Sequence, residues 1–145
     1  LKDATIEGID ANKNGIRDDV ELAIFKLHPD SARIRAAELQ YAMALHMELT
    51  SEIFNSETLA AALQEKSRAS LCVVNTVQKI KALDNNETIN EALAIINTRK
   101  QEVENLVFNI NERRTRRQEI REKYMTSYGE IVGPECDIDL IFLAN

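Results

Sequence analysis

The sequence has few of the residues that interrupt helices or favour strands. Its 145 residues include four Gly, two Pro and no Trp, and aromatic residues make up only 5%. Ala, Leu, Ile, Glu, Arg and Gln, which suit helices, are well represented instead. This composition predicts an all-α fold, in a chain long enough to bury a core of its own.

Long apolar runs, an excess of basic charge and catalytic signatures are also missing from the sequence. No apolar run approaches the roughly 18 to 20 residues of a membrane span. Eighteen basic and 24 acidic residues give a net charge of −6, which argues against broad nucleic-acid binding. There is no H-E-x-x-H or E-x-x-H motif, no phosphate-binding glycine loop and no nucleophile elbow. The sequence therefore indicates no particular reaction.

Apolar periodicity predicts four helices between an N-terminal arm and a C-terminal tail. We expect a single domain with an arm at 1–17, helices at 18–28, 30–54, 57–83 and 87–126, and a tail at 129–145. An unbroken helix over 31–83 is the alternative, but it would be roughly 80 Å long and could not pack compactly. The expected architecture is an up-down bundle of three to four helices, with the tail extended against it.

The expected helix at 87–126 has the most regular apolar pattern. Spacings of four and three alternate along it, as in a heptad repeat, at Ile89, Leu93, Ile96, Lys100, Val103, Val107 and Ile110. Such a stripe packs either on the rest of the bundle or on a second copy of the chain, so a homodimer is open. A capping-box pattern at 98–101 leaves a kink there as an alternative.

A basic stretch follows that stripe. Residues 112–123 hold six basic and three acidic side chains. Arg114, Arg117 and Arg121 continue the apolar stripe, and a cationic stripe cannot form a dry core. The helix end is expected either to project into solvent or to meet acidic partners. An anion-binding or nucleic-acid-binding role for this stretch is an alternative function.

Two histidines and several carboxylates are the remaining candidates for chemistry. We expect His28 near a helix end, where a partial positive charge is favourable. His46 lies in an apolar stretch and is read first as a core or boundary residue. An enzymatic alternative, a helical hydrolase or transferase, would use Glu38, His46 or Glu48 along one helix.

The most informative segment is D-A-N-K-N-G-I-R-D-D-V-E at residues 10–21. It fits D-x-[DN]-x-[DN]-G-x5-E at every fixed position, and this spacing can wrap oxygen ligands around one calcium ion. The expected ligands, with Ile16 acting through its carbonyl, are Asp10, Asn12, Asn14, Ile16, Asp18 and Glu21. Gly15 would permit the sharp turn. The alternative is an Asn-Gly turn before an acidic helix start, with no metal.

These residues resemble the EF-hand calcium loop, and also the single loops of secreted or periplasmic bacterial proteins. The resemblance covers 12 of the 145 residues. Arg17 stands where the EF-hand family has an aliphatic residue that pairs with a partner loop, and no second loop occurs. The resemblance therefore implies a structural calcium ion rather than a regulatory switch. Two Asn in place of Asp favour the weaker, extracellular range of affinity.

The two cysteines, Cys72 and Cys136, are either reduced thiols or one disulfide. A bond between them would close about 65 residues and stabilise by roughly 4 kcal/mol in the chain-entropy model. Compartments rich in calcium are usually also oxidising, so we favour the disulfide. The expected location is extracytoplasmic, either periplasmic or secreted, with room for a lipid anchor upstream of Leu1.

Taken together, these features favour a non-enzymatic protein over an enzyme. We expect an extracytoplasmic calcium-binding helical bundle with a binding or scaffolding role, in a bacterial envelope or secreted assembly. Its partner would be a protein that the sequence does not identify. The helical enzyme and the anion binder remain the two alternatives.

Overall fold

The computed structural model describes residues 5–77, 86–129, 131 and 133–144. Its helices are α1 (Asp18–Leu27), α2 (Ala32–Met47), α3 (Ser56–Asn75), α4 (Asn86–Val107), α5 (Asn111–Tyr124) and a short 3-10 helix, η2 (Leu140–Phe142). No strand occurs within these ranges, so the all-α prediction is confirmed for them. None of the helices in this part of the chain has the length and apolar character needed to cross a bilayer.

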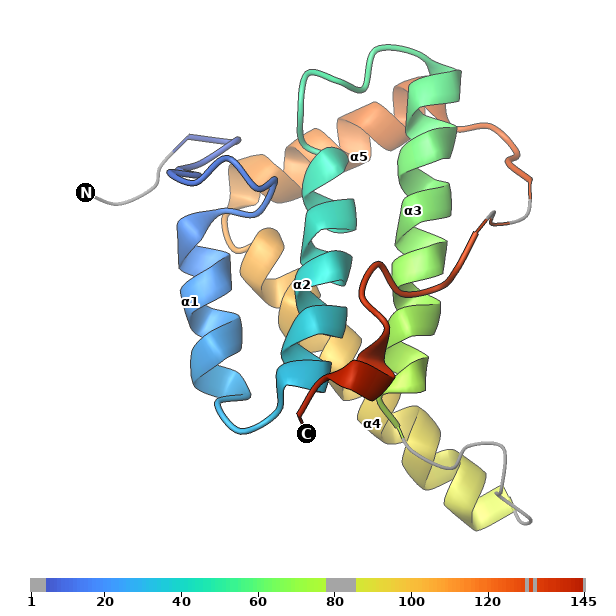
Figure 1. Ribbon diagram of the computed structural model, residues 1–145. Coiled ribbons are helices and arrows are strands. Elements are labelled where there is room, and N and C mark those ends of the chain that lie inside the picture. The colour runs from blue at the N-terminus through green and yellow to red at the C-terminus, as the bar shows by residue number, and fades with distance from the viewer. Residues whose placement is uncertain (1–4, 78–85, 130, 132, 145) are drawn as a thin grey trace.

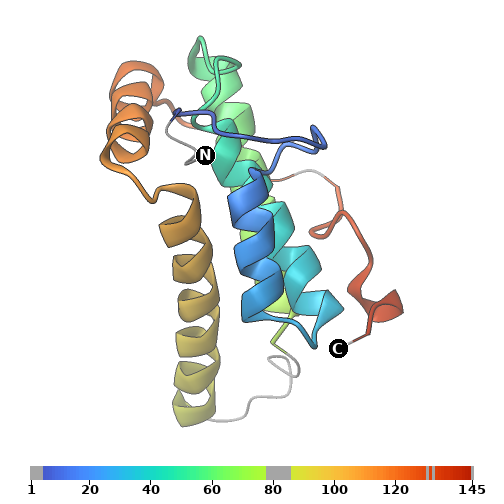
Figure 2. The ribbon, with the colours of Figure 1, turned by 90° about the vertical axis from the view of Figure 1, so that its left-hand side faces the viewer.

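The helices are arranged in layers (Figures 1 and 2). α1, α2 and α3 lie side by side and run in alternating directions (Figure 1). α4 packs behind them, and α5 turns away from α4 at a steep angle across one end of the bundle (Figure 2). The arm before α1 lies at this same end (Figures 1 and 2). The α4–α5 junction is therefore placed to contact the predicted calcium loop.

The main core surrounds α2. Ala37, Tyr41 and Leu45 are completely buried and recur every four residues on one face of the helix. Its neighbours contribute buried residues to the same cluster, among them Val20, Ile24, Ala69, Val73, Val103 and Val107. A smaller cluster, in which Ile120 meets Leu59 and Leu63, holds α5 against α3. Each such aliphatic side chain stabilises the fold by about 1.5 to 3 kcal/mol.

The predicted break near residue 55 is present, but α2 is shorter than predicted. α2 ends at Met47 rather than at 54, and Asn55 caps α3 by accepting from the Thr58 N–H at 2.8 Å. The hydroxyl of Thr50 donates to the Met47 carbonyl, which competes with continuation of the helix. α3 is described to Asn75, and the predicted stretch to 83 lies mostly outside the described residues. A continuous helix over 31–83 is ruled out by the break.

The prediction of one helix over 87–126 is wrong. α4 ends at Val107, and Ile110 is extended, with φ −126° and ψ 156°, before α5 begins. The break falls well after the 98–101 segment where a kink was considered. Arginine side chains donate to the carbonyls of Leu106, Val107 and Phe108 at 2.7 to 2.8 Å, and so take the place of further helical hydrogen bonds. These donors include Arg17, which is 89 residues away from Leu106, so local patterns could not show the break.

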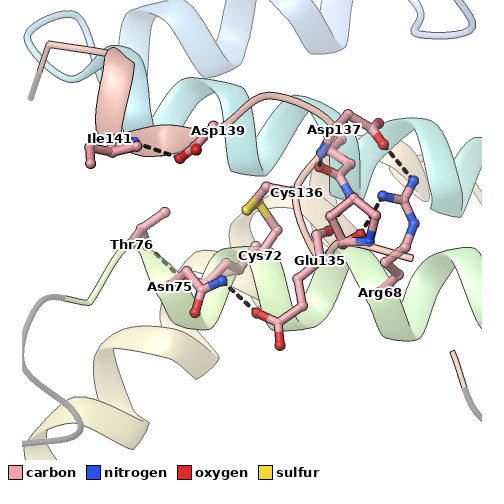
Figure 3. The surroundings of a disulfide bond; sticks show 12 residues. Arg68, Cys72, Asn75, Thr76, Glu135, Cys136, Asp137, Asp139 and Ile141 are labelled. Atoms are coloured by element: carbon pink, nitrogen blue, oxygen red, sulfur yellow. Dashed lines mark hydrogen bonds and ion pairs between the residues drawn. A yellow bond between two sulfur atoms is a disulfide. The ribbon is translucent and has the colours of Figure 1, made fainter. Parts of the chain in front are cut away.

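The tail is fastened to α2 and α3 around a disulfide. Cys72 on α3 and Cys136 in the tail are bonded, as predicted, with their Cα atoms 4.9 Å apart (Figure 3). Gln40 donates to the Glu135 carbonyl and accepts from the Asp137 N–H, both at 2.8 Å. Arg68 reaches the carboxylate of Asp137 at 2.5 Å (Figure 3). The tail lies against the bundle, as expected, but its described residues form bends and the turn of η2 and no strand.

Candidate metal sites

The predicted calcium loop turns around the side chain of Asp10. Its Oδ1 accepts from the Asn14 N–H at 3.2 Å, and its Oδ2 accepts from the Gly15 N–H at 2.9 Å. Gly15 has φ +84°, a conformation that L side chains rarely adopt. The glycine required by the pattern thus makes the turn that lets the loop fold back on its first residue.

The other predicted ligands surround this turn without forming a closed cage. Asn14 Nδ2 donates to Glu21 Oε1, which brings the last acidic residue of the pattern over the middle of the loop. The Asp18 carboxylate accepts from the Ala11 N–H at 3.1 Å and so points back to the start of the loop. Asn12 is exposed. Asp10, Asp18 and Glu21 do not meet as a group within 4.8 Å, so a bound ion would have to draw them together.

The second half of the loop is built into the bundle. The side chain of Ile16 is buried in the main core, with 7% of its surface exposed. A Cβ on Gly15 would lie 3.3 Å from Met43 of α2, so the loop backbone packs closely against that helix. The loop is therefore continuous with the core and does not stand apart from it.

Two buried arginines tie the loop and arm to the α4–α5 junction. Arg17 donates to the Val107 carbonyl at 2.8 Å, and Arg113 donates to the carbonyls of Thr5 and Ile6 at 2.7 and 3.1 Å. Both arginines also reach Asn109 Oδ1, at 3.3 and 2.6 Å. Arg17, the residue that departs from the pattern of the predicted loop, is thus held by contacts within its own chain.

Arg117 and Arg121 of the basic stretch are also engaged within the chain. The guanidinium of Arg117 lies 3.8 Å from the centroid of the Phe108 ring. Arg121 Nη2 lies 2.9 Å from both carboxylate oxygens of Glu48, which is completely buried. The cationic stripe thus meets acidic and aromatic partners within the chain. This is the second of the two expectations for this helix end, which was to project into solvent or to meet acidic partners. These contacts weigh against the anion-binding alternative for 112–123.

A second group of ligand-type atoms lies at the opposite end of α1. His28 Nε2 is 2.6 Å from Glu38 Oε2 and 3.2 Å from Glu102 Oε2. Within the described residues, these three side chains form the one His, Cys, Asp or Glu group whose ligand atoms all lie within 4.8 Å of one another. His28 follows α1, Glu38 is on α2 and Glu102 is on α4. Residues so far apart in sequence carry no spacing signal, so sequence reasoning missed the group.

Glu38 is an unusual member of this group, the His28–Glu38–Glu102 cluster. Its side chain is completely buried, and no described residue gives either carboxylate oxygen a hydrogen bond of acceptable geometry. Burial raises the pKa of Glu38 to about 8, and the negative charge of Glu102 adds to this rise, while Arg99 opposes it. Burial at this position therefore favours the neutral form of the carboxyl, and a cation beside it would favour the ionised form.

The residues of the enzymatic alternative face different partners. Glu38 contacts His28, whereas Glu48 pairs with Arg121. Burial lowers the pKa of His46, and the positive charges of Arg17 and Arg113 lower it further, while Asp10 and Glu7 oppose them. His46 thus responds to the charges around the calcium loop. These three side chains belong to separate environments along α2 and do not form one reaction centre among the described residues.

Comparison with family models, curated proteins and solved structures finds no match to this chain.

Proposed function

We propose that this protein is a non-enzymatic, calcium-binding helical bundle in which the ion has a structural role. The folded turn of the loop is the observation that carries the proposal. Asp10 organises the turn through two backbone N–H groups, Gly15 supplies the positive φ, and Glu21 reaches the side chain of Asn14. A turn of this kind gathers oxygen atoms from a short segment, as a calcium ion requires.

The donors match a hard cation. Three carboxylates, two amide oxygens and one main-chain carbonyl can supply the six to eight oxygens that calcium takes. The proposed ligands are Asp10, Asn12, Asn14, Ile16 through its carbonyl, Asp18 and Glu21. The amide of Asn14 would present its oxygen, rather than the nitrogen that now faces Glu21. Bound calcium would neutralise charge at the negative start of α1 and hold the arm in place.

A structural role is favoured over a regulatory one by how the loop is held. Ile16 is part of the main core, and Arg17 is hydrogen-bonded to the end of α4. A loop anchored at these two residues has little freedom to swing, and a regulatory loop needs a second state to populate. Calcium would then stabilise the one folded state.

The proposed location is extracytoplasmic, and the proposed role is binding or scaffolding. The Cys72–Cys136 bond is compatible with an oxidising compartment, and the weak affinity expected of this loop suits high external calcium. We include a homodimer through α4 in this proposal, because Ile89 and Leu93 of the predicted stripe are 39% and 50% exposed. Light scattering of the purified chain would test the dimer.

Calorimetric titration of the metal-free protein with calcium tests the function. The wild type should bind one calcium ion with a dissociation constant of about 10⁻⁴ to 10⁻³ M. The double substitution Asp10→Asn and Glu21→Gln should remove saturable binding, whereas Asp30→Asn, which changes an exposed carboxylate outside the loop, should leave it unchanged. The proposal is wrong if the wild type shows no calcium heat at these concentrations, or if the double variant binds as the wild type does.

A further inference from the structure

We propose that the His28–Glu38–Glu102 cluster is a second metal site, selective for a zinc-type divalent cation and independent of the calcium loop. One imidazole nitrogen and two carboxylate oxygens converge there from three separate elements, within 4.8 Å of one another. The completely buried carboxylate of Glu38 points into the group without a hydrogen bond of its own among the described residues.

The donor chemistry identifies the class of cation. Calcium and magnesium prefer oxygen-only ligands, whereas imidazole nitrogen suits zinc and its transition-metal neighbours. A His ligand with two carboxylates is thus a mixed nitrogen and oxygen set, unlike the oxygen-only set of residues 10–21. Both cysteines are in the disulfide, so thiolates do not compete for such an ion.

The distances fit an ion after a small adjustment. Donor atoms in tetrahedral zinc coordination lie about 3.3 Å apart, given bonds of about 2.0 to 2.1 Å. His28 Nε2 and Glu102 Oε2 are already 3.2 Å apart, whereas His28 Nε2 and Glu38 Oε2 are 2.6 Å apart. The His28–Glu38 pair would therefore open by a fraction of an ångström, which side-chain rotation at the partly exposed His28 can supply.

Access and charge at the cluster are also suited to a cation. A surface cavity of about 270 Å³ is lined by His28 and Glu102, with Arg99 at its wall. An ion can enter from this side, and a fourth coordination position can face the cavity. With His28 neutral and both carboxylates ionised, the cluster and Arg99 together carry one negative charge. When a cation binds, the proton that Glu38 loses passes to solvent. The Arg99 guanidinium donates to Thr76 Oγ1, which keeps it directed toward α3.

Zinc binding measured in excess calcium tests this inference. Calcium fills the loop, so one zinc ion bound per chain would report a different site. His28→Ala, Glu38→Gln and Glu102→Gln should each weaken zinc binding by at least about 10-fold. His46→Ala, which removes the one other histidine, and Glu91→Gln, on the exposed part of α4, are the matched controls and should bind zinc like the wild type.

The outcomes separate this site from the calcium site. Cobalt, as a coloured substitute for zinc, should give a visible absorption band that His28→Ala abolishes and His46→Ala retains. If Glu38→Gln does not fold, Glu102→Gln still decides the question, because that side chain is 29% exposed. Absence of saturable zinc binding by the wild type would overturn the inference, as would undiminished binding by folded ligand variants. Loss of zinc binding in the Asp10→Asn, Glu21→Gln variant would place zinc in the loop instead and would equally overturn it.

Discussion

The proposed calcium loop and the His28–Glu38–Glu102 cluster differ in how the chain brings their candidate ligand atoms together. All the loop donors come from 12 consecutive residues, and its turn is made by local hydrogen bonds to Asp10. The cluster joins residues up to 74 positions apart and exists only where α1, α2 and α4 meet. A local site can form before the fold is complete, whereas the cluster requires the packed bundle.

The two sites also differ in which contacts of the folded chain hold them in place. The candidate ligands of the loop are close together in sequence, but the contacts that hold the loop are not. Arg17 and Arg113 tie the loop and the arm to the α4–α5 junction. The cluster needs no such support, because its residues lie on or next to helices that already pack through the core. Perturbing the junction or the ions should therefore affect the two sites unequally, whereas freeing the tail should leave both sites intact.

The largest expected effect comes from removing the disulfide. Replacing both cysteines by Ala, which leaves no free thiol to bind zinc, frees a chain segment of 64 positions between the cysteines. The expected loss of stability is about 4 kcal/mol in the chain-entropy model. The bond supplies no ligand atom to either candidate site, so both metal affinities should survive in the folded variant. Urea unfolding followed by calcium and zinc titration measures both quantities. Loss of either affinity alone would show that the tail supports that site.

The next largest effect is expected from Arg113→Met. The substitution removes the Arg113 donor from the carbonyls of Thr5 and Ile6 and leaves Asn109 Oδ1 with the longer contact to Arg17, and it should cost about 2 to 3 kcal/mol. It should also weaken calcium binding, because the arm loses its anchor, while zinc binding stays unchanged. Arg116→Met on the same helix, which makes none of these hydrogen bonds, is the control. If calcium binding and zinc binding weaken equally in this variant, the two sites are not independent.

Calcium itself should stabilise the chain by a smaller amount. At a calcium concentration 10 times the dissociation constant, the free energy of unfolding should rise by about 1.4 kcal/mol, because the ion binds the folded state. Removing calcium with a chelator should reverse this gain. Chemical unfolding with and without calcium measures it, and the variant carrying Asp10→Asn and Glu21→Gln should show no gain. A gain retained by that variant would mean that calcium acts elsewhere.

The smallest expected effect concerns the two histidines, one near each site. The pKa of His46 is held below its ordinary value of 6.5, mainly by burial. The folded state therefore binds fewer protons than the unfolded state, and His46 contributes stability at neutral pH that declines as pH falls below 6.5. His46→Gln should flatten this acid-side decline slightly in thermal unfolding curves.

The same histidines can report which ion binds where. Calcium beside Asp10 should lower the pKa of His46 further, because Asp10 now opposes the lowering. Zinc should instead perturb the resonances of His28. Proton NMR of the two imidazoles would follow both effects in one sample, and a response of both histidines to both ions would contradict two independent sites.

Much of the helical architecture was predictable because its signals are local. Ser31 caps α2 and Asn55 caps α3 where polar residues precede apolar stripes, and Pro29 separates α1 from α2. The bonding of Cys72 to Cys136 was also anticipated. The early end of α2 and the separation of α4 from α5 were not predicted. The distant Arg17 binds the end of α4, and just after α2 the Glu48 carboxylate pairs with Arg121, and such contacts exist only in the folded chain.

The sequence alone determined the helical class, the turn of residues 10–21 and the set of oxygen donors on it, because backbone propensity and short-range hydrogen bonds act within a few residues. Only the tertiary structure decided that Arg113 binds the arm and that Arg121 pairs with the buried Glu48. It alone also brought His28, Glu38 and Glu102 together. Such contacts depend on how the helices pack. Packing brings together residues that are far apart in sequence, and their spacing follows no recognisable pattern.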